Sequence, residues 1–283
     1  MARFSREQII QRLEKKVQSG RPIVGAGASS GLIAAAAVAG GADLVIVYNT
    51  GRTRLMGLPT SHHLNHANPT TMAMYQQIAN VVTDTPIIGG AEAQDPTFAD
   101  LGRLVDSFRD AGFDGLINFP TIGPFPEVGE DRALGYAREQ EMVRQAAERD
   151  VFTACYAYDV EQAVGLAAAG ADVLVPHAGW TTGGLVGSDA SALSLEDSCA
   201  HVQSLIEAAR EINPKILFLA HGGAISSPAD TEYMYAHTDA QGFLGASSVE
   251  RVPVEDAMRD AIQRWKGLRT TPFTATQPEE ARS

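Results

Sequence analysis

The amino-acid sequence predicts an α/β fold, a (β/α)8 TIM barrel, because short apolar runs recur eight times and most lead into a helix-like stretch. Continuous runs of Val, Ile, Leu and Phe without alternation are typical of strands buried on both faces. Strands that alternate with helices form a parallel sheet, and eight such units in 283 residues fit one closed barrel of roughly 250 residues. The expected strands are Pro22–Gly27, Asp43–Tyr48, Pro86–Ala91, Gly115–Phe119, Phe152–Ala157, Asp172–Pro176, Ile216–Ala220 and Gly242–Ala246.

An extra N-terminal helix is expected over residues 5–18, before the first strand. Ser5 and Gln8 have the spacing of a capping box, in which each side chain bonds to the other residue's backbone. Apolar residues then recur on one face of the helix, at Ile9, Ile10, Leu13 and Val17. We expect this helix to cover the bottom of the barrel.

Capping residues followed by proline mark three later helix starts, because proline at the first helical position lacks only a donor that has no partner there. These pairs, which predict the second, third and seventh barrel helices, are Asn68-Pro69, Asp95-Pro96 and Ser227-Pro228. Ser194 predicts the start of the sixth helix. The eighth is expected from near Pro253, with five residues buried: Ala257, Met258, Ala261, Ile262 and Trp265.

The chain is expected to form one barrel domain over residues 1–269, followed by an extended or disordered tail over 270–283. Residues 51–68 follow the second strand as a long loop, and long loops in compact domains are often functional. This loop is a candidate lid and carries His62, His63 and His66. These histidines lack the glutamate of a helical zinc motif, so a zinc site is not expected.

Composition excludes several partners. The formal net charge of −12 repels nucleic acid phosphates, so no nucleic-acid partner is expected. No segment approaches ~18 consecutive apolar residues, and the N-terminus lacks a signal pattern, so we expect no membrane partner and a cytoplasmic protein. Two cysteines cannot form a disulfide framework, which fits a reducing compartment.

Lysine placement excludes one class of mechanism. The four lysines are Lys15, Lys16, Lys215 and Lys266, and none lies where a predicted strand ends. A Schiff-base aldolase or a pyridoxal phosphate enzyme needs a lysine in its pocket. We therefore expect neither pyridoxal phosphate nor a Schiff-base lysine.

Glycines and serines follow three predicted strands, where barrels commonly bind phosphate through backbone N–H groups. A phosphate or carboxylate site is one interpretation, and tight βα turns that need glycine are the other. The candidate residues are Ser29 and Ser30 after the first strand, Gly222 and Gly223 after the seventh, and Gly245, Ser247 and Ser248 at the eighth.

Two carboxylates follow the third strand. Glu92 is a candidate general base or magnesium ligand, because a carboxylate at a strand top in a barrel is typical of catalysis; the alternative is a salt bridge to Arg52 or Arg54. Asp95 is a weaker candidate for the metal, because its position before Pro96 predicts a helix cap.

Histidines end the sixth and seventh strands. His177 and His221 can act as acid, base or electrophile, or pack as neutral rings in the barrel. The rim is completed by groups that can orient a polar anion: Tyr48, Asn118, and Arg52 or Arg54 as a carboxylate clamp. Cys155 can be a nucleophile, but a buried structural thiol is the commoner outcome.

Five strings resemble the phosphoenolpyruvate hydrolase-like family of TIM-barrel proteins, also described as similar to indole-glycerol-phosphate synthase. The resemblance extends from about Phe4 to Leu268 and implies a phosphonopyruvate or phosphoenolpyruvate substrate and a link to isocitrate lyase and phosphoenolpyruvate mutase. The strings begin at Gly25 (GAGASSG), Tyr48 (YNTGR), Asn118 (NFPT), Val175 (VPHAG) and Gly242 (GFLGASSVER).

The expected function is cleavage or hydrolysis of a small anionic oxo-acid by a lyase or hydrolase. Glu92 is expected to be the base or a magnesium ligand, and His177 and His221 the proton donors or electrophiles. A metabolite-sensing barrel without turnover is the alternative. A small anionic metabolite and further copies of the same chain are the expected partners.

Overall fold

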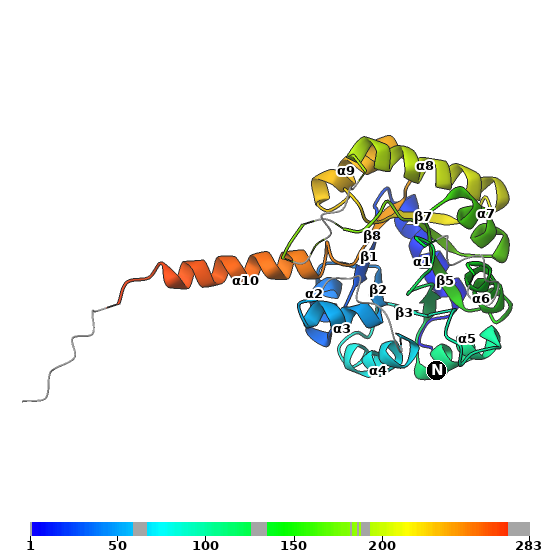
Figure 1. Ribbon diagram of the computed structural model, residues 1–283, viewed down its shortest axis with the longest axis horizontal. Coiled ribbons are helices and arrows are strands. Elements are labelled where there is room, and N and C mark those ends of the chain that lie inside the picture. The colour runs from blue at the N-terminus through cyan, green and yellow to red at the C-terminus, as the bar shows by residue number, and fades with distance from the viewer. Residues whose placement is uncertain are drawn as a thin grey trace, which may run out of the picture.

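The computed structural model describes residues 2–58, 67–125, 135–181, 183–185, 187 and 193–270. It confirms the predicted barrel: eight parallel strands pair in chain order, and β8 pairs with β1 to close the sheet (Figure 1). The strands are β1 (Ile23–Gly27), β2 (Leu44–Val47), β3 (Ile87–Gly90), β4 (Gly115–Ile117), β5 (Phe152–Ala157), β6 (Val173–Pro176), β7 (Leu217–Ala220) and β8 (Gly242–Gly245).

All helices except α1 follow the strands along the chain, and all except α10 pack around the barrel. Two helices, α3 and α4, follow β2, and α3 lies inside the stretch predicted as a long loop. The helices are α1 (Arg6–Gln18), α2 (Gly31–Ala39), α3 (Asn49–Leu55), α4 (Ala67–Ala79), α5 (Leu101–Ala111), α6 (Ala137–Glu148), α7 (Val160–Ala169), α8 (Leu195–Ile212), α9 (Pro228–His237) and α10 (Arg251–Lys266).

The inside of the barrel is a packed core, closed at its amino end by α1. Ile23, Leu44 and Leu244 are buried inside the barrel, and Ile9 and Leu13 of α1 belong to the same cluster. The predicted capping box of Ser5 and Gln8 starts this helix. Because the amino end is filled, ligands have access to the barrel from the carboxyl ends of the strands.

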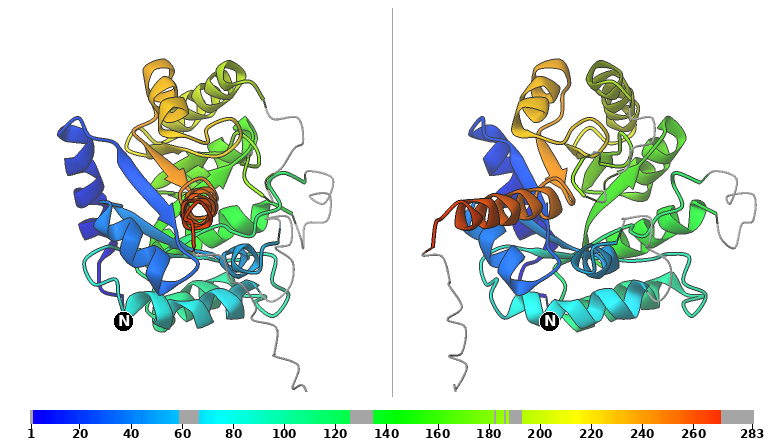
Figure 2. Two further views of the ribbon diagram at one scale, coloured as in Figure 1. Left: turned by 90° about the vertical axis from the view of Figure 1, so that its left-hand side faces the viewer. Right: turned by 60° about the vertical axis from the view of Figure 1, so that its left-hand side comes forward.

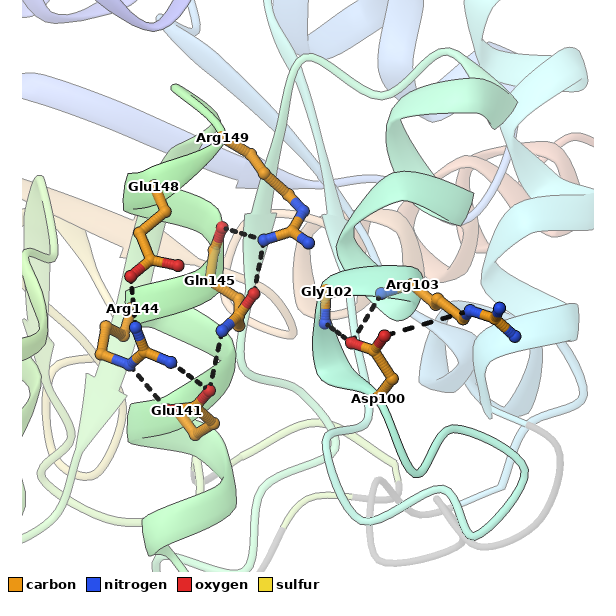
Figure 3. A network of polar contacts seen from close by, with 8 residues as sticks. All are labelled: Asp100, Gly102, Arg103, Glu141, Arg144, Gln145, Glu148 and Arg149. Atoms are coloured by element: carbon orange, nitrogen blue, oxygen red, sulfur yellow. Dashed lines mark hydrogen bonds and ion pairs between the residues drawn. The ribbon is translucent and has the colours of Figure 1, made fainter.

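Two further apolar clusters lie between the sheet and its helices. One joins β2 and β3 to α4 and α5 through residues such as Met74 and Phe108, and the other joins β6 and β7 to α7 and α8 through Leu166, Val202 and Phe218. On their outer surfaces, α5 and α6 are each stabilised by contacts between their own polar groups. Figure 3 shows Asp100 capping the first turn of α5, and Arg144 between two glutamates on α6.

The predicted helix starts at Ser194 and Ser227 are confirmed, since both side chains cap their helices. The start at Asp95-Pro96 is wrong: α5 begins at Leu101, and Asp100 caps it. Asp95 instead accepts hydrogen bonds from the backbone N–H and hydroxyl of Thr97, which forms a local turn. Asn68 lies in the first turn of α4, which begins at Ala67.

The eighth barrel helix, α10, begins close to Pro253 as expected, but the predicted burial is wrong. Met258 is 60% exposed and Trp265 72%, and Ala257, Ala261 and Ile262 are not buried either. The chain leaves the barrel after β8, and Figures 1 and 2 show α10 projecting away from it. The apolar periodicity was correct, but periodicity does not say what covers a helix face.

His62, His63 and His66, and residues 271–283 of the predicted tail, lie outside the described residues. Within the described part of the chain, no helix is long and apolar enough to cross a membrane.

Candidate active site

His177 and His221 lie next to each other because their strands are neighbours. They extend the pairing of β6 and β7 by one parallel bridge, and the backbone N–H of His221 donates to the carbonyl of Pro176. Their ring centroids are 4.5 Å apart, and both side chains are buried. The two predicted candidates thus form one pair at the carboxyl ends of the strands.

Hydrogen bonds to the backbone give the two rings opposite proton positions. Nδ1 of His177 accepts a bond of 3.1 Å from the backbone N–H of Gly179, so in the neutral ring the proton sits on Nε2. Nδ1 of His221 lies 2.5 Å from the carbonyl oxygen of Leu244, which only accepts, so the proton sits on Nδ1. His177 therefore offers an Nε2–H donor, and His221 an Nε2 acceptor.

Both rings are neutral near pH 7. Burial lowers the pKa of His177 well below its usual range, and the neighbouring His221 lowers it further. Burial also lowers the pKa of His221 to about 4. A neutral pair of opposite tautomers can polarise one oxygen and accept one proton without a prior change in charge.

Tyrosines surround the histidine pair. The ring of Tyr158 stacks on His177 with centroids 4.3 Å apart, and Tyr156 contacts both histidines. The hydroxyl groups of Tyr48 and Tyr156 lie 2.6 Å apart. Burial raises the pKa of both phenols, so they are neutral donors and acceptors.

A buried ion pair lies at the ends of β2 and β8. Nε of Arg54 donates to Oε2 of Glu250 over 2.7 Å, and Arg54 also contacts the hydroxyl of Thr50. The charge of Arg54 is close enough to His221 and Tyr48 to lower the pKa of each. Arg52, the other predicted clamp residue, lies exposed on α3.

A cavity of about 310 Å³ opens beside this ion pair. Polar side chains of Ser29, Arg54 and Glu250 line it together with apolar residues of α2, α3 and α10. Oγ of Ser29 and Oε1 of Glu250 are buried without a hydrogen-bond partner among the described residues. Because unpaired buried polar atoms are costly, these two atoms are suited to a ligand that supplies hydrogen bonds.

Asn118 is fully engaged inside the barrel wall. Its Oδ1 accepts from the backbone N–H of Tyr156, and its Nδ2 donates to Oε2 of Glu139 and to the carbonyl of Tyr156. Its amide thus continues the pairing of β4 with β5 beyond the last ladder residue. The sequence places Asn118 correctly at the end of a strand, but its side chain bonds within the barrel wall and joins β4 to β5.

Glu139 was missed by sequence reasoning. It lies on α6, is completely buried, and accepts bonds from Asn118, Thr121, Gln94 and the backbone N–H of Ile122. Burial raises its pKa to about 7 against the opposing effect of these donors. An isolated Glu within a helix gives no signal in the sequence, because only the fold shows that it faces inward.

Glu139 predicts a pH dependence of stability. Its pKa is higher in the folded state than in the unfolded chain, so the stabilisation present at about pH 4.5 is lost as the pH rises through about 7. Glu139→Gln should remove this slope and cost about 1–3 kcal/mol at pH 5, because an acceptor is lost. Urea unfolding at pH 5 and pH 7.5 measures the free energy of unfolding and its change with pH. An equal change with pH in wild type and variant would contradict the raised pKa of Glu139.

The carboxylate of Asp95, the weaker of the two metal candidates after β3, accepts hydrogen bonds from neighbouring residues. Oδ1 of Asp95 accepts from Thr97 and Oδ2 accepts from Asn68, while the backbone of Glu92 is held by the Asn68 amide. The described residues include no group of three His, Cys, Asp or Glu side chains placed to hold a metal. Glu92 lies half-buried across the closed barrel from β7.

The glycine loops pack against each other. Gly222 and Gly223 have φ of +78° and +59°, and the N–H of Gly223 donates to the carbonyl of Gly179 over 2.7 Å. A Cβ on Gly222 would meet that same carbonyl oxygen at 2.2 Å. Tight turns therefore account for this pair, and the N–H of Gly223 is not available to an anion.

The other predicted binding residues have local roles. The side chain of Ser30 caps α2, and the carbonyl of Ser247 accepts from the first N–H groups of α10. Gly245 ends β8 and lies close to the hydroxyl of Ser248.

The four lysines and the two cysteines do not lie in settings that would activate a nucleophile. Lys15 and Lys16 lie on α1, Lys215 precedes β7 and Lys266 ends α10. As expected, none of the four lies at the carboxyl end of a strand. Cys155 and Cys199 are free and buried, and burial raises the pKa of the Cys155 thiol, which disfavours the reactive thiolate.

Comparison with known proteins finds relatives in sequence and solved structures with the same fold. Two tomato (Solanum lycopersicum) proteins, "ToMV susceptible protein tm-1(GCR26)" and "ToMV resistance protein Tm-1(GCR237)", are each 38% identical over 92% and 93% of this chain. The chain spans about a third of their length, 35% and 36%. A crystal structure of phosphonopyruvate hydrolase in complex with oxalate and Mg²⁺ shares the fold with a TM-score of 0.61 and 16% identity, covering 91% of this chain and 87% of that one.

The profile of the family described as "Phosphoenolpyruvate hydrolase-like" matches residues 8–268, which is most of the chain. The resemblance seen in the sequence strings is thereby confirmed. The chain belongs to the phosphoenolpyruvate hydrolase-like family.

Proposed function

We propose that this chain is an enzyme that cleaves the bond between the α- and β-carbons next to the carbonyl group of a small oxo-acid anion, by proton transfer at His177 and His221. The observation that carries the proposal is the neutral pair of opposite tautomers, with ring centroids 4.5 Å apart. Crystal structures that share the fold include phosphonopyruvate hydrolase and 2,3-dimethylmalate lyase, which supports an oxo-acid or related ligand.

Each histidine has one part in this chemistry. His177 donates a hydrogen bond from Nε2–H to the carbonyl oxygen, which stabilises the negative charge that develops there. His221 accepts at Nε2 the proton of a hydroxyl group on the carbon that is β to the carbonyl group. The bond between the α- and β-carbons breaks, the hydroxyl oxygen becomes the carbonyl of one product, and the electron pair of the broken bond forms the enolate of the other. Protonated His221 then returns the proton to the α-carbon of that enolate. Atoms and charge balance, and no lysine is required.

Binding of the anion is assigned to the ion-pair side of the rim. Arg54 supplies positive charge, while Oγ of Ser29 and Oε1 of Glu250 supply hydrogen-bonding atoms without partners in the described structure. This set suits a ligand with a carboxylate and a hydroxyl group. Glu92 stays a second candidate base, on the opposite side of the rim.

Proton transfer can be detected before the substrate is known. The chain is incubated in D2O with pyruvate, 2-oxobutyrate, oxaloacetate, phosphonopyruvate and phosphoenolpyruvate in turn, with and without Mg²⁺, and followed by ¹H and ³¹P NMR. None of these compounds carries the β-hydroxyl group that cleavage requires, so the test follows the enolate half of the reaction. We expect the protons beside the carbonyl group of at least one oxo-acid to exchange faster than without protein, and this increase to be lost in His221→Asn.

The alternative is a metabolite-sensing barrel, which fits tomato relatives named for ToMV resistance and susceptibility rather than for a reaction. A thermal shift with one of these anions, but neither exchange nor product, would favour sensing and reject catalysis. His237→Asn is the matched control, because His237 lies exposed on α9.

A further inference from the structure

We infer that the hydroxyl group of Tyr158 is a catalytic hydrogen-bond donor, which stabilises the same oxyanion as Nε2–H of His177. The inference rests on the proposed function, because it adds a second donor to that site. Three observations carry it: the place of Tyr158 in the barrel mouth, a buried hydroxyl group without a partner, and the fixed position of the ring.

The alternation of side chains along β5 places Tyr158 inside the mouth of the barrel. Every second residue of β5 up to Tyr156 belongs to the apolar cluster inside the barrel, and Tyr158, the next in this series, packs against that cluster. The pairing of β5 with β6 puts Tyr156 beside Val175. Two residues further along both strands, Tyr158 lies beside His177, which is itself bridged to His221. The three side chains therefore form one row across the ends of three neighbouring strands.

The hydroxyl group of Tyr158 is buried, and its oxygen has no hydrogen-bond partner among the described residues. The tyrosine hydroxyl groups around it are bonded: that of Tyr136 donates to the carbonyl of Tyr156 over 2.6 Å, and those of Tyr48 and Tyr156 lie 2.6 Å apart. A buried hydroxyl group without a partner costs stability. This hydroxyl group is therefore suited to a ligand atom that accepts from it beside the histidine pair.

The phenol keeps its proton and can donate it in a hydrogen bond. Burial raises the pKa of Tyr158 well above its ordinary value, and the charge of Glu139 raises it further. The ring is stacked on His177 with centroids 4.3 Å apart and an angle of 23° between the planes. Because the rings are nearly parallel, one ligand oxygen at their edge can accept from both the phenol and Nε2–H. Two fixed donors stabilise a developing negative charge better than one.

Contacts with two segments of the chain fix the ring. His177 stacks on it, and a Cβ on Gly123 would lie 2.5 Å from Cδ2 of Tyr158, so the loop after β4 packs against it as well. Gln162 joins this loop to the end of β5. Its Oε1 accepts from the backbone N–H of Tyr158 over 2.9 Å, and its Nε2 donates to the carbonyl of Gly123 over 3.0 Å. A donor held in this way needs little rearrangement when charge develops on the ligand.

Tyr158→Phe tests the donor, because phenylalanine keeps the stacked ring and removes only the hydroxyl group. The oxo-acid whose protons wild type exchanges fastest is followed by ¹H NMR in D2O. We expect kcat of exchange to fall roughly 10²–10³-fold with little change in KM, since the donor acts on charge that develops during the reaction. Tyr235→Phe is the matched control, because Tyr235 packs on the cluster between the sheet and its helices. If Tyr158 serves only as packing for His177, Tyr158→Phe keeps the wild-type rate, and the inference is wrong.

Binding of oxalate separates this inference from the proposed reaction. Oxalate is a stable anion with the shape of the enolate of pyruvate, so it can accept from the same donors without turnover. Titration calorimetry, with and without Mg²⁺, should show that Tyr158→Phe weakens oxalate binding by roughly 10–100-fold. If wild type binds oxalate but exchanges no protons, the proposed reaction fails, and this affinity ratio alone decides on Tyr158. An unchanged affinity in that case, or neither exchange nor oxalate binding in wild type, would overturn the donor role.

The midpoint of urea unfolding gives a readout that needs no ligand. Tyr158→Phe should keep or raise the midpoint, because it removes an unpaired buried hydroxyl group. Tyr136→Phe should lower it, because the carbonyl of Tyr156 loses one of its donors. A decrease in Tyr158→Phe as large as that in Tyr136→Phe would mean that the hydroxyl group of Tyr158 is already bonded within the protein, which would contradict the inference.

Discussion

His221→Asn is expected to lower the rate of proton exchange or product formation by roughly 10²–10⁴-fold, because the general base is removed. Asn retains a side-chain donor toward the carbonyl of Leu244, which His221 contacts at 2.5 Å, so the local structure should persist. The rate is measured by NMR in D2O with the best compound of the panel. An unchanged rate would remove His221 from the mechanism.

The pH profile gives an independent check on the same residue. A histidine with an ordinary pKa loses base function below pH ~6.5. Burial lowers the pKa of His221 to about 4, so the rate should stay level from pH 7 to about 5 and fall only as the pH approaches 4. The helix-surface variant His237→Asn should keep both the rate and the profile.

Glu250→Ala is expected to lower the free energy of unfolding by about 3–5 kcal/mol, because it leaves the charge of Arg54 buried without a partner. Both side chains of this pair are only 3–4% exposed. Urea unfolding measures the change. Asp239→Ala breaks the exposed pair with Arg210 and should cost less than about 1 kcal/mol.

The double variant Arg54→Met with Glu250→Leu separates the cost of burying an unpaired charge from the attraction between the two charges. Replacing both charges with apolar side chains of similar size removes the unpaired ion, so most of the lost stability should return. If Glu250→Ala costs no more than Asp239→Ala, the pair is exposed in solution and the cavity beside it does not have the structure described.

The barrel could be predicted because its signals are local. Each strand is a short apolar run that needs no alternation, and Ser5, Ser194 and Ser227 cap their helices with their own side chains. Asp95 shows where local signals fail. The pair Asp-Pro is compatible with both a helix start and a turn. The hydroxyl of Thr97 donates to Asp95, and this bond stabilises the turn.

The site was predicted in position but only partly in role. His177 and His221 follow from strand ends that the topology makes neighbours. Their opposite tautomers depend on the N–H of Gly179 and the carbonyl of Leu244, which no sequence pattern places. Asn118 and Glu139 depend on each other across 21 positions of the chain, so the sequence named one and missed the other.

The central claim is that His177 and His221 form a neutral pair with protons on opposite nitrogens. Long-range ¹H–¹⁵N NMR of the imidazole rings tests it directly, with the signals assigned by His177→Asn and His221→Asn. The account predicts that at pH 6 both rings are neutral, with His177 protonated on Nε2 and His221 on Nδ1. A charged ring at that pH, or the same tautomer in both, would contradict it.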